Sequence, residues 1–193
     1  TLAYVAKRTD VFNVYIIPAG GGDETCLTSG FENTDGPDYT TDSEWIWFNG
    51  QKQGRMQLWR MRADGSDLQQ MTDDDHQNWF PHPSPGGQKV LYVAYEPGVT
   101  GHPRFKEVEL RIFPASGGQP DILLEMLGGQ GTINVPCWAP DGNKFAFVRY
   151  DRPDELYLQA VEIRQWIEMT TTCERAEPLT AKEAQSLLVQ TAP

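Results

Sequence analysis

The sequence predicts an all-β fold built from repeated four-stranded antiparallel units, and three observations support this prediction. Three segments of the chain align with one another, at offsets of 44 and 55 residues, when each is anchored on a proline. Each segment leads into a short apolar or aromatic run of the kind that fits a pleated sheet. No helical pattern competes with these runs. The anchoring prolines are Pro37, Pro81 and Pro136, and the runs are residues 45–48, 90–94 and 145–148.

A second repeated block carries the remaining strands of each unit. It joins a run with period-2 alternation to a glycine-containing tight turn, and a further short run follows the turn. A period of about 44 residues with four short strands and two turns is typical of a β-propeller blade. The alternating runs are residues 12–17, 56–61 and 108–113, the turns are 18–22, 62–66 and 114–118, and the final runs are 24–28, 68–72 and 122–126.

Lettering the strands a to d from the propeller axis outward gives about three blades, within residues 1–150. Residues 2–28 supply strands b to d, residues 34–72 and 78–126 supply two complete blades, and residues 132–150 supply strands a and b. A closed ring takes about four blades or more. We therefore expect a longer chain, a second copy in a homodimer, or the C-terminal segment to complete the ring.

Residues 151–193 do not repeat and form a short helical or irregular tail. Within it, residues 156–160 fit a third strand of the last blade, whereas residues 160–167 fit a helix equally well. A capping box at residues 180–183 predicts a short helix at about residues 181–190. This helix either packs across an exposed blade edge or docks a partner.

Composition argues against several classes of function. The 193 residues include 16 Lys and Arg against 27 Asp and Glu, a formal net charge of −11, which disfavours nucleic acid as a partner. The chain has no apolar run of about 18 residues that would predict a membrane span, and its first ten residues lack a signal-peptide pattern. Cys26, Cys137 and Cys173 are too scattered to predict a disulfide framework.

Antiparallel connectivity assigns the loops of each blade to two faces. The d-to-a and b-to-c loops share one face, called the loop face here, whereas tight turns form the opposite face. Loops on a repetitive scaffold often bind ligands, so we expect this face to recognise a protein or a small polar ligand. The loop face comprises residues 30–33, 73–77 and 128–131 together with residues 7–10, 51–55 and 96–106.

The loop at residues 96–106 accounts for the 11-residue difference between the two repeat offsets. Its His102, Arg104 and Lys106 are basic residues in an acidic protein. Arg104 is the candidate donor to an anion or a carboxylate, because a guanidinium group binds such ligands in a bidentate manner. Alternatively, Arg104 and Lys106 pair with neighbouring acidic residues.

The innermost strands are expected to line the propeller channel with polar and aromatic side chains. Asp, His, Asn and Trp side chains at a channel mouth suit a small polar ligand or a sugar. A water-filled axis with satisfied polar groups is the alternative. The predicted ligand-binding residues, taken from these strands and the loop face, are Asp35, Asp38, Trp79, His82, His102, Arg104, Gln130 and Asn134.

The repeat pattern resembles that of TolB and the TolB-like proteins, and three motifs resemble the TolB-like proteins more closely than TolB itself. They are residues 35–39 (Asp-Gly-Pro-Asp-Tyr), 78–85 (Asn-Trp-Phe-Pro-His-Pro-Ser-Pro) and 128–132 (Gly-Gly-Gln-Gly-Thr). The resemblance covers about residues 1–150 and implies a six-bladed propeller, of which roughly the C-terminal half is present. It also implies a protein-binding scaffold, and a periplasmic location if the role matches that of TolB. The odd number of cysteines and the absence of a visible signal also allow a cytoplasmic location.

The same repeat also occurs in enzymes, which leaves two alternatives to a binding scaffold. One is a metal-dependent enzyme or carbohydrate-binding protein resembling oligogalacturonate lyase, a class that holds its metal with His and Gln in the propeller mouth. The other is the gating propeller of a prolyl-oligopeptidase-type peptidase. The residues favour a non-enzymatic role, because the chain contains no GxSxG or HExxH motif.

A divalent metal is the one cofactor for which the sequence offers candidate ligands. Histidine and amide or carboxylate side chains from the loop face and the adjoining inner strand supply nitrogen and oxygen donors. Their spacing matches no diagnostic metal motif, so the leading prediction includes no cofactor. The candidate ligands are His76, His82, His102 and Gln130, with Asp74 as an alternative to Gln130.

Overall fold

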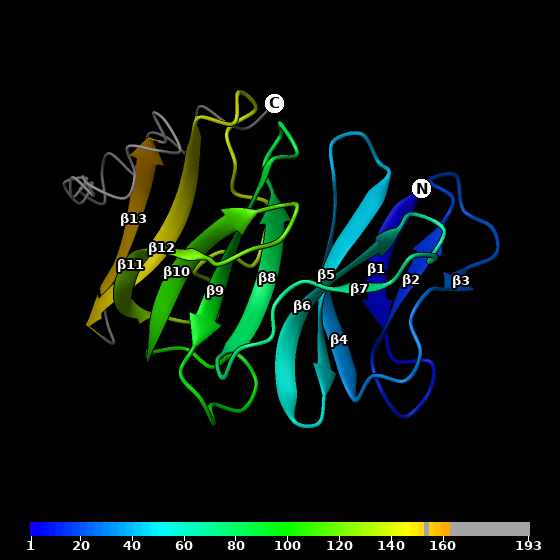
Figure 1. Cartoon of the computed structure of the whole chain (residues 1–193), viewed down its shortest axis with the longest axis horizontal. Coiled ribbons are helices and arrows are strands. Elements are labelled where there is room, and N and C mark those ends of the chain that lie inside the picture. Colours follow the sequence, from blue (N-terminus) through cyan, green and yellow to red (C-terminus); the bar gives the residue numbers. More distant parts are fainter. Residues whose placement is uncertain (153–154, 163–193) are drawn as a thin grey trace.

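A computed structural model describes residues 1–152 and 155–162, in which thirteen strands form four antiparallel sheets. The sheets follow one another in chain order and stand side by side, from the first at the right of Figure 1 to the fourth at the left. These residues contain no helix, and hence none of the length and apolar character needed to cross a membrane. The predicted all-β fold of partial propeller blades is confirmed.

Each sheet is a meander in which consecutive strands pair, because short turns join antiparallel neighbours. We name the sheets the first to fourth blades. The first has β1 (Leu2–Ala6), β2 (Asn13–Ile17) and β3 (Thr25–Cys26), and the second has β4 (Asn33–Tyr39), β5 (Trp45–Lys52), β6 (Arg55–Arg62) and β7 (Gln69–Gln70). The third has β8 (Gln77–Pro83), β9 (Lys89–Tyr95), β10 (Lys106–Pro114) and β11 (Asp121–Gly128), and the fourth has β12 (Lys144–Arg152) and β13 (Glu155–Glu162).

Apolar side chains cover both faces of the third blade, because alternate residues of a strand point to opposite faces. On one face, Tyr92 belongs to the same buried cluster as Trp47 of the second blade. On the other face, Val93 belongs to a cluster that includes Phe147 of the fourth blade. Burying an aliphatic or aromatic side chain contributes about 1.5–3 kcal/mol. Contact between blades is therefore the main source of stability in this part of the fold.

The innermost strands β4 and β8 each carry a bulge, at positions that are equivalent in the repeat. The pairing register shifts beside Gly36 in β4 and beside Phe80 in β8, 44 residues later. Both residues have a left-handed backbone with φ of 56°. Glycine adopts this conformation freely, whereas in a bulky residue it costs roughly 1–3 kcal/mol. The Phe80 N–H donates to the Asn49 Oδ1 at 3.0 Å, which helps to hold the strained backbone in place.

The fourth blade differs from the prediction in its innermost segment. Residues 132–138 form no strand and contribute only an isolated bridge between Trp138 and Phe145. Pro136 does not account for this difference, because the equivalent Pro37 and Pro81 lie within β4 and β8. Instead, the Gly131 N–H donates to the Asn134 Oδ1 at 2.7 Å, which stabilises a turn in place of an extended strand.

The start of the tail follows one of the two predicted alternatives. Strand β13 pairs with β12 from Lys144 opposite Glu162 to Arg152 opposite Glu155. The strand alternative for residues 156–160 is thus correct, and the helix alternative is wrong for residues 160–162. The helix predicted at residues 181–190 lies outside the described residues.

The 96–106 loop is anchored at Pro103 beside the end of the third blade. The Pro103 carbonyl accepts hydrogen bonds from the Tyr95 hydroxyl at 3.3 Å and from the Gln130 N–H at 3.4 Å. Gly129 has φ of 122°, and a Cβ there would lie 2.1 Å from the Pro103 oxygen. Only glycine permits this close approach between two backbone segments. The position of the long loop therefore depends on Gly129.

Replacing Gly129 with alanine is expected to destabilise the protein by roughly 1–3 kcal/mol, because the added Cβ collides with backbone and the φ is unfavourable. Urea unfolding at equilibrium measures this change. Gly86→Ala is the matched control, since a Cβ at Gly86 meets no atom within 4 Å and its φ is not left-handed. Equal stability of the two variants would contradict the proposed anchor.

The two described cysteines are free thiols in different surroundings, which predicts different reactivity. Cys26 is exposed, whereas burial raises the pKa of Cys137 to about 12. A thiol reacts through its thiolate, so native Cys137 is expected to resist maleimide while Cys26 reacts. Mass spectrometry of a Cys173→Ser variant checks this, with urea-unfolded protein as the control in which both thiols react. Rapid labelling of native Cys137 would contradict the burial.

Candidate binding site on the loop face

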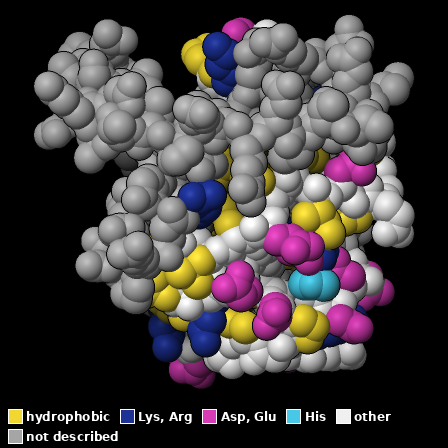
Figure 2. Space-filling model, turned by 90° about the vertical axis from the view of Figure 1, so that its left-hand side faces the viewer, with side chains coloured by type: hydrophobic (Ala, Val, Ile, Leu, Met, Phe, Trp, Pro, Cys, Tyr) yellow, Lys and Arg dark blue, Asp and Glu magenta, His cyan; other side chains and the backbone are white. Residues whose placement is uncertain are grey.

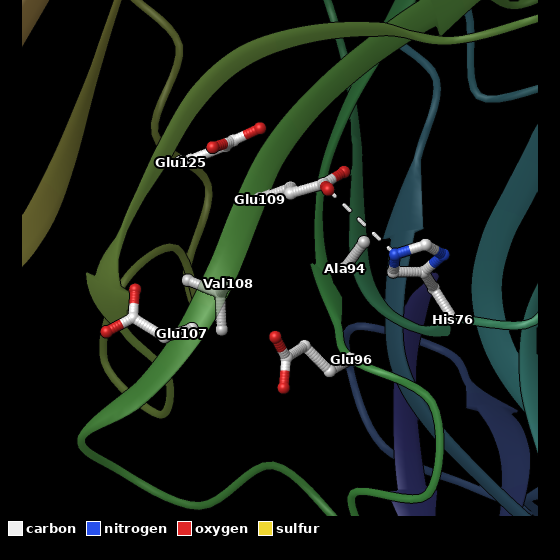
Figure 3. A pocket seen from close by; sticks show the side chains of 7 residues that line it. All are labelled: His76, Ala94, Glu96, Glu107, Val108, Glu109 and Glu125. Carbon is white, nitrogen blue, oxygen red and sulfur yellow. Dashed lines mark ion pairs between the residues drawn. The ribbon is translucent and has the colours of Figure 1, made fainter.

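A hollow of about 350 Å³ opens on the loop face over strands β9 to β11. Four of its seven lining residues are glutamates, which makes the lining strongly acidic. Figure 3 shows that His76 approaches the hollow from the side opposite the strands that carry the glutamates. We name this site the acidic hollow. It is lined by His76, Ala94, Glu96, Glu107, Val108, Glu109 and Glu125.

Strand register explains why the carboxylates gather there. Ala94 of β9 lies opposite Glu109 of β10, and Glu109 lies opposite Glu125 of β11. Residues directly opposite each other in neighbouring strands point to the same face of a sheet. Glu107 shares this face because it precedes Glu109 by two residues. The small Ala94 side chain leaves room between the acidic strands and His76.

Arg111 neutralises the inner wall of the hollow. Its guanidinium donates to Glu109 on the same strand and to the Asp74 Oδ2 at 3.0 Å. A third contact, 3.1 Å long, joins its Nη2 to the His76 Nε2. Burial opposes the charge of Arg111, but the hydrogen bond to Glu109 and the charge of that carboxylate help to leave its pKa above the ordinary value. Arg111 thus holds the 73–77 loop against the third blade.

The remaining carboxylates of the hollow have no ion-pair partner among residues 1–152 and 155–162. Glu96, Glu107 and Glu125 are exposed, and within the described part of the chain none of them forms an ion pair. The His76 ring lies between the Arg111 guanidinium, 3.1 Å from its Nε2, and the carboxylates of Asp74 and Glu109, each 3.9 Å from a ring nitrogen. Figure 2 shows acidic side chains gathered around a histidine on this side of the molecule. The hollow therefore attracts cations and basic groups.

His82 connects three blades at the inner edge of the propeller. Its Nδ1 lies 2.9 Å from the Asp38 Oδ2 of the second blade, and its Nε2 contacts the Ile133 carbonyl of the segment before the fourth blade. The Trp138 indole N–H in turn donates to the His82 carbonyl at 2.9 Å. The residue is 4% exposed, and both ring nitrogens are engaged. Asp38 and His82, both predicted ligand-binding residues, meet here in a connection between blades.

Asp35, Trp79 and His102 also meet near the propeller axis, as the tip of the 96–106 loop reaches the inner strands. The His102 ring packs on Trp79 and Phe80, with centroids 4.6 and 5.1 Å apart, and its Nε2 lies 3.7 Å from the Asp35 Oδ2. Among the described residues, neither the Trp79 Nε1 nor the His102 Nδ1 has a hydrogen-bond partner, although both atoms are buried. An unsatisfied buried group costs about 1–3 kcal/mol. We name Asp35, Trp79, Phe80 and His102 the axial cluster.

The other predicted ligand-binding residues lie apart from both sites. Arg104 is exposed and, in the described ranges, makes no ion pair, so the predicted pairing with neighbouring acids does not form there. Gln130 accepts through its backbone carbonyl from the Tyr150 hydroxyl at 2.7 Å, and Asn134 caps the turn at Gly131. Both residues shape the 129–134 segment.

Sequence reasoning missed most of the acidic hollow. It singled out His76 but none of the glutamates or Arg111. The signal was present, since Glu107, Glu109 and Arg111 alternate along a predicted strand and so share one face. Glu125 and Asp74 join them only through strand register and a loop contact, which no spacing in the sequence indicates.

The candidate metal ligands are dispersed among these sites. His76 lies in the acidic hollow, His82 between the blades, His102 in the axial cluster and Gln130 in the 129–134 segment. Within residues 1–152 and 155–162, no group of three or more His, Cys, Asp or Glu side chains is arranged to hold a metal ion. The predicted metal set is therefore not assembled in this structure.

Comparison with known proteins identifies the family to which this chain is similar. A family profile described as the TolB β-propeller domain matches residues 1–109. An uncharacterized protein of Agrobacterium fabrum (strain C58) is 45% identical over 150 residues, which make up 78% of this chain and 51% of that protein. The chain thus spans about half the length of this relative.

Solved structures agree with the sequence match. A TolB candidate from Agrobacterium tumefaciens superposes with a TM-score of 0.75 at 45% identity, over 78% of this chain and 55% of that chain. TolB from Acinetobacter baumannii, at 15% identity, shares the fold with a TM-score of 0.66 over 83% of this chain and 37% of that chain. Oligogalacturonate lyase from Vibrio parahaemolyticus, at 12% identity, likewise shares only the fold, with a TM-score of 0.58 over 84% of this chain and 48% of that chain. Because the profile matches more than half of its residues, this chain belongs to the TolB β-propeller family.

Proposed function

We propose that this chain is part of a TolB-like propeller scaffold that binds a protein partner through its loop face, with the acidic hollow receiving a basic segment of that partner. The observation that supports the proposal most strongly is the hollow itself. It lies on the face that connectivity assigns to the longer loops, and its volume of about 350 Å³ suits a few side chains.

The charge of the hollow specifies the chemistry of the partner. Glu96, Glu107 and Glu125 offer carboxylates at the rim, while Arg111 and His76 already satisfy each other and the inner acids. Lysine or arginine side chains of a partner complement such a lining. The formal net charge of −11 adds long-range attraction for a basic segment and speeds the encounter at low salt.

The wall of the hollow is held rigid, which favours selective binding over loose ion capture. The Gln57 side-chain amide donates to the carbonyls of Asp74 and His76 at 3.0 and 2.9 Å. The Asn78 amide donates to the Asp74 Oδ1 at 3.0 Å. The 73–77 loop is thus fixed by buried amides before any partner arrives, and less ordering is required on binding.

The proposal predicts that a lysine-rich peptide binds the acidic hollow. Replacing Glu96, Glu107 and Glu125 with glutamine together is expected to weaken binding about tenfold, since each exposed pair is worth roughly 0.2–1 kcal/mol. Fluorescence anisotropy of a labelled oligolysine peptide, measured at several salt concentrations, tests this expectation.

The matched control replaces Asp23, Asp67 and Asp141 with asparagine, because these exposed residues lie in turns of the opposite face and the net charge changes equally. The control is expected to bind the peptide as the unmodified protein does. Equal weakening of both triple variants would show attraction to the overall charge and would overturn the assignment to the hollow.

A further inference from the structure

We infer that the axial cluster is a second binding site, for a small neutral polyhydroxylated molecule such as a monosaccharide. The inference goes beyond protein binding at the acidic hollow and depends on different residues. The axial cluster lies on the inner strands of the second and third blades, under the tip of the 96–106 loop. Its experiment therefore succeeds or fails independently of the peptide experiment.

The first argument is an unused hydrogen-bond donor. Trp79 is 3% exposed, and its indole N–H has no acceptor in the described structure. Two other tryptophans satisfy theirs: the Trp59 Nε1 donates to the Gly50 carbonyl at 3.1 Å and the Trp138 Nε1 to the His82 carbonyl at 2.9 Å. A buried donor that lacks a partner points to a missing oxygen acceptor.

The second argument is the strained backbone beside this donor. Phe80 has φ of 56°, where the equivalent residue of the second blade is a glycine. Its ring packs against both Trp79 and His102, with centroids 5.7 and 5.1 Å away. Bulky residues in this conformation cluster at ligand sites, because the surrounding structure must hold them there. Here the strain orients an aromatic wall next to the unused donor.

The chemistry of the ligand follows from the groups present. The Trp79 N–H requires an acceptor, and the Asp35 carboxylate, which accepts from the Gly36 N–H through Oδ1 at 2.8 Å, can accept a further hydrogen bond through Oδ2 from a donor. A hydroxyl group serves as both, and a molecule with several hydroxyls can meet the two requirements together. Trp79 and Phe80 are 3% and 4% exposed, so their rings can contact the apolar face of a sugar ring only when the 96–106 loop moves aside. The negative charge of Asp35 disfavours an anionic sugar.

The 96–106 loop controls access to the donor. The Trp79 Nε1 and the His102 Nδ1 are both buried, and the His102 ring packs on the indole. A ligand therefore reaches the indole N–H when the His102 side chain moves aside. Gly98 and Gly101, with φ of 82° and 68°, flank the tip of the loop on the side away from its Pro103 anchor. Val99, which lies between these glycines, packs against the buried core cluster, so opening the tip requires this side chain to leave its contact.

The experiment follows the tryptophan indole N–H signals by ¹⁵N–¹H NMR during titration with D-glucose, D-galactose and D-mannose. A Trp79→Phe variant identifies the Trp79 signal by its loss. We expect at least one sugar to shift the Trp79 signal saturably and to leave the Trp59 signal in place. Asp35→Asn is expected to raise the midpoint of that titration about tenfold.

Two controls make the result decisive. Asp67→Asn removes an exposed carboxylate of the opposite face and is expected to leave the midpoint unchanged, and D-glucuronate is expected to bind more weakly than the neutral sugars. A Trp79 signal that none of the three sugars shifts saturably would overturn the inference, as would equal shifts of all indole signals or an Asp35→Asn midpoint that does not change.

Discussion

The structure depends on the contact between neighbouring blades. A strand that is apolar on both faces must be covered on both faces, and in the third blade Tyr92 and Val93, one residue apart, are each fully buried against a different neighbour. This packing leaves little freedom for polar chemistry inside a blade. The polar side chains that are buried inside the blades, such as Asn49, Gln57 and Arg111, are hydrogen-bonded within the fold. Both candidate binding sites lie outside this packed interior, at the inner edge and on the loop face.

The two sites differ in how they use this constraint. On one face of the third blade, Tyr92 is buried in an apolar cluster, whereas Glu107 and Glu109 line the acidic hollow. The same face of the sheet is therefore apolar in one part and acidic in another. Solvent reaches these carboxylates directly. In the axial cluster the polar atoms are buried among aromatic rings, and access depends on a loop. One site therefore suits rapid, salt-dependent encounter, and the other suits slower and more selective binding.

Sequence reasoning recovered the fold because the repeat is periodic and its turns are chemically distinct. The repeat offsets predict that residues 35, 79 and 134 lie near the axis. Asp35 lies beside His102 because the 96–106 loop, whose length is evident in the sequence, reaches the inner strands. Other features had no such signal. The Ile133 carbonyl contacts His82 because of the direction in which the backbone points it, and the Asp74 carboxylate meets Arg111 because of the conformation of its loop. Residue type encodes neither of these features.

His82 has a consequence for how the molecule folds. In many repeat proteins each unit is stabilised by its nearest neighbours alone, so units can be lost one at a time. Here a single buried side chain satisfies its hydrogen bonds only when the blades on both sides are in place. If either neighbouring segment undocks, one ring nitrogen of His82 loses its hydrogen-bond partner. This shared dependence couples the docking of the second blade and of the 129–134 segment through one residue of the third blade.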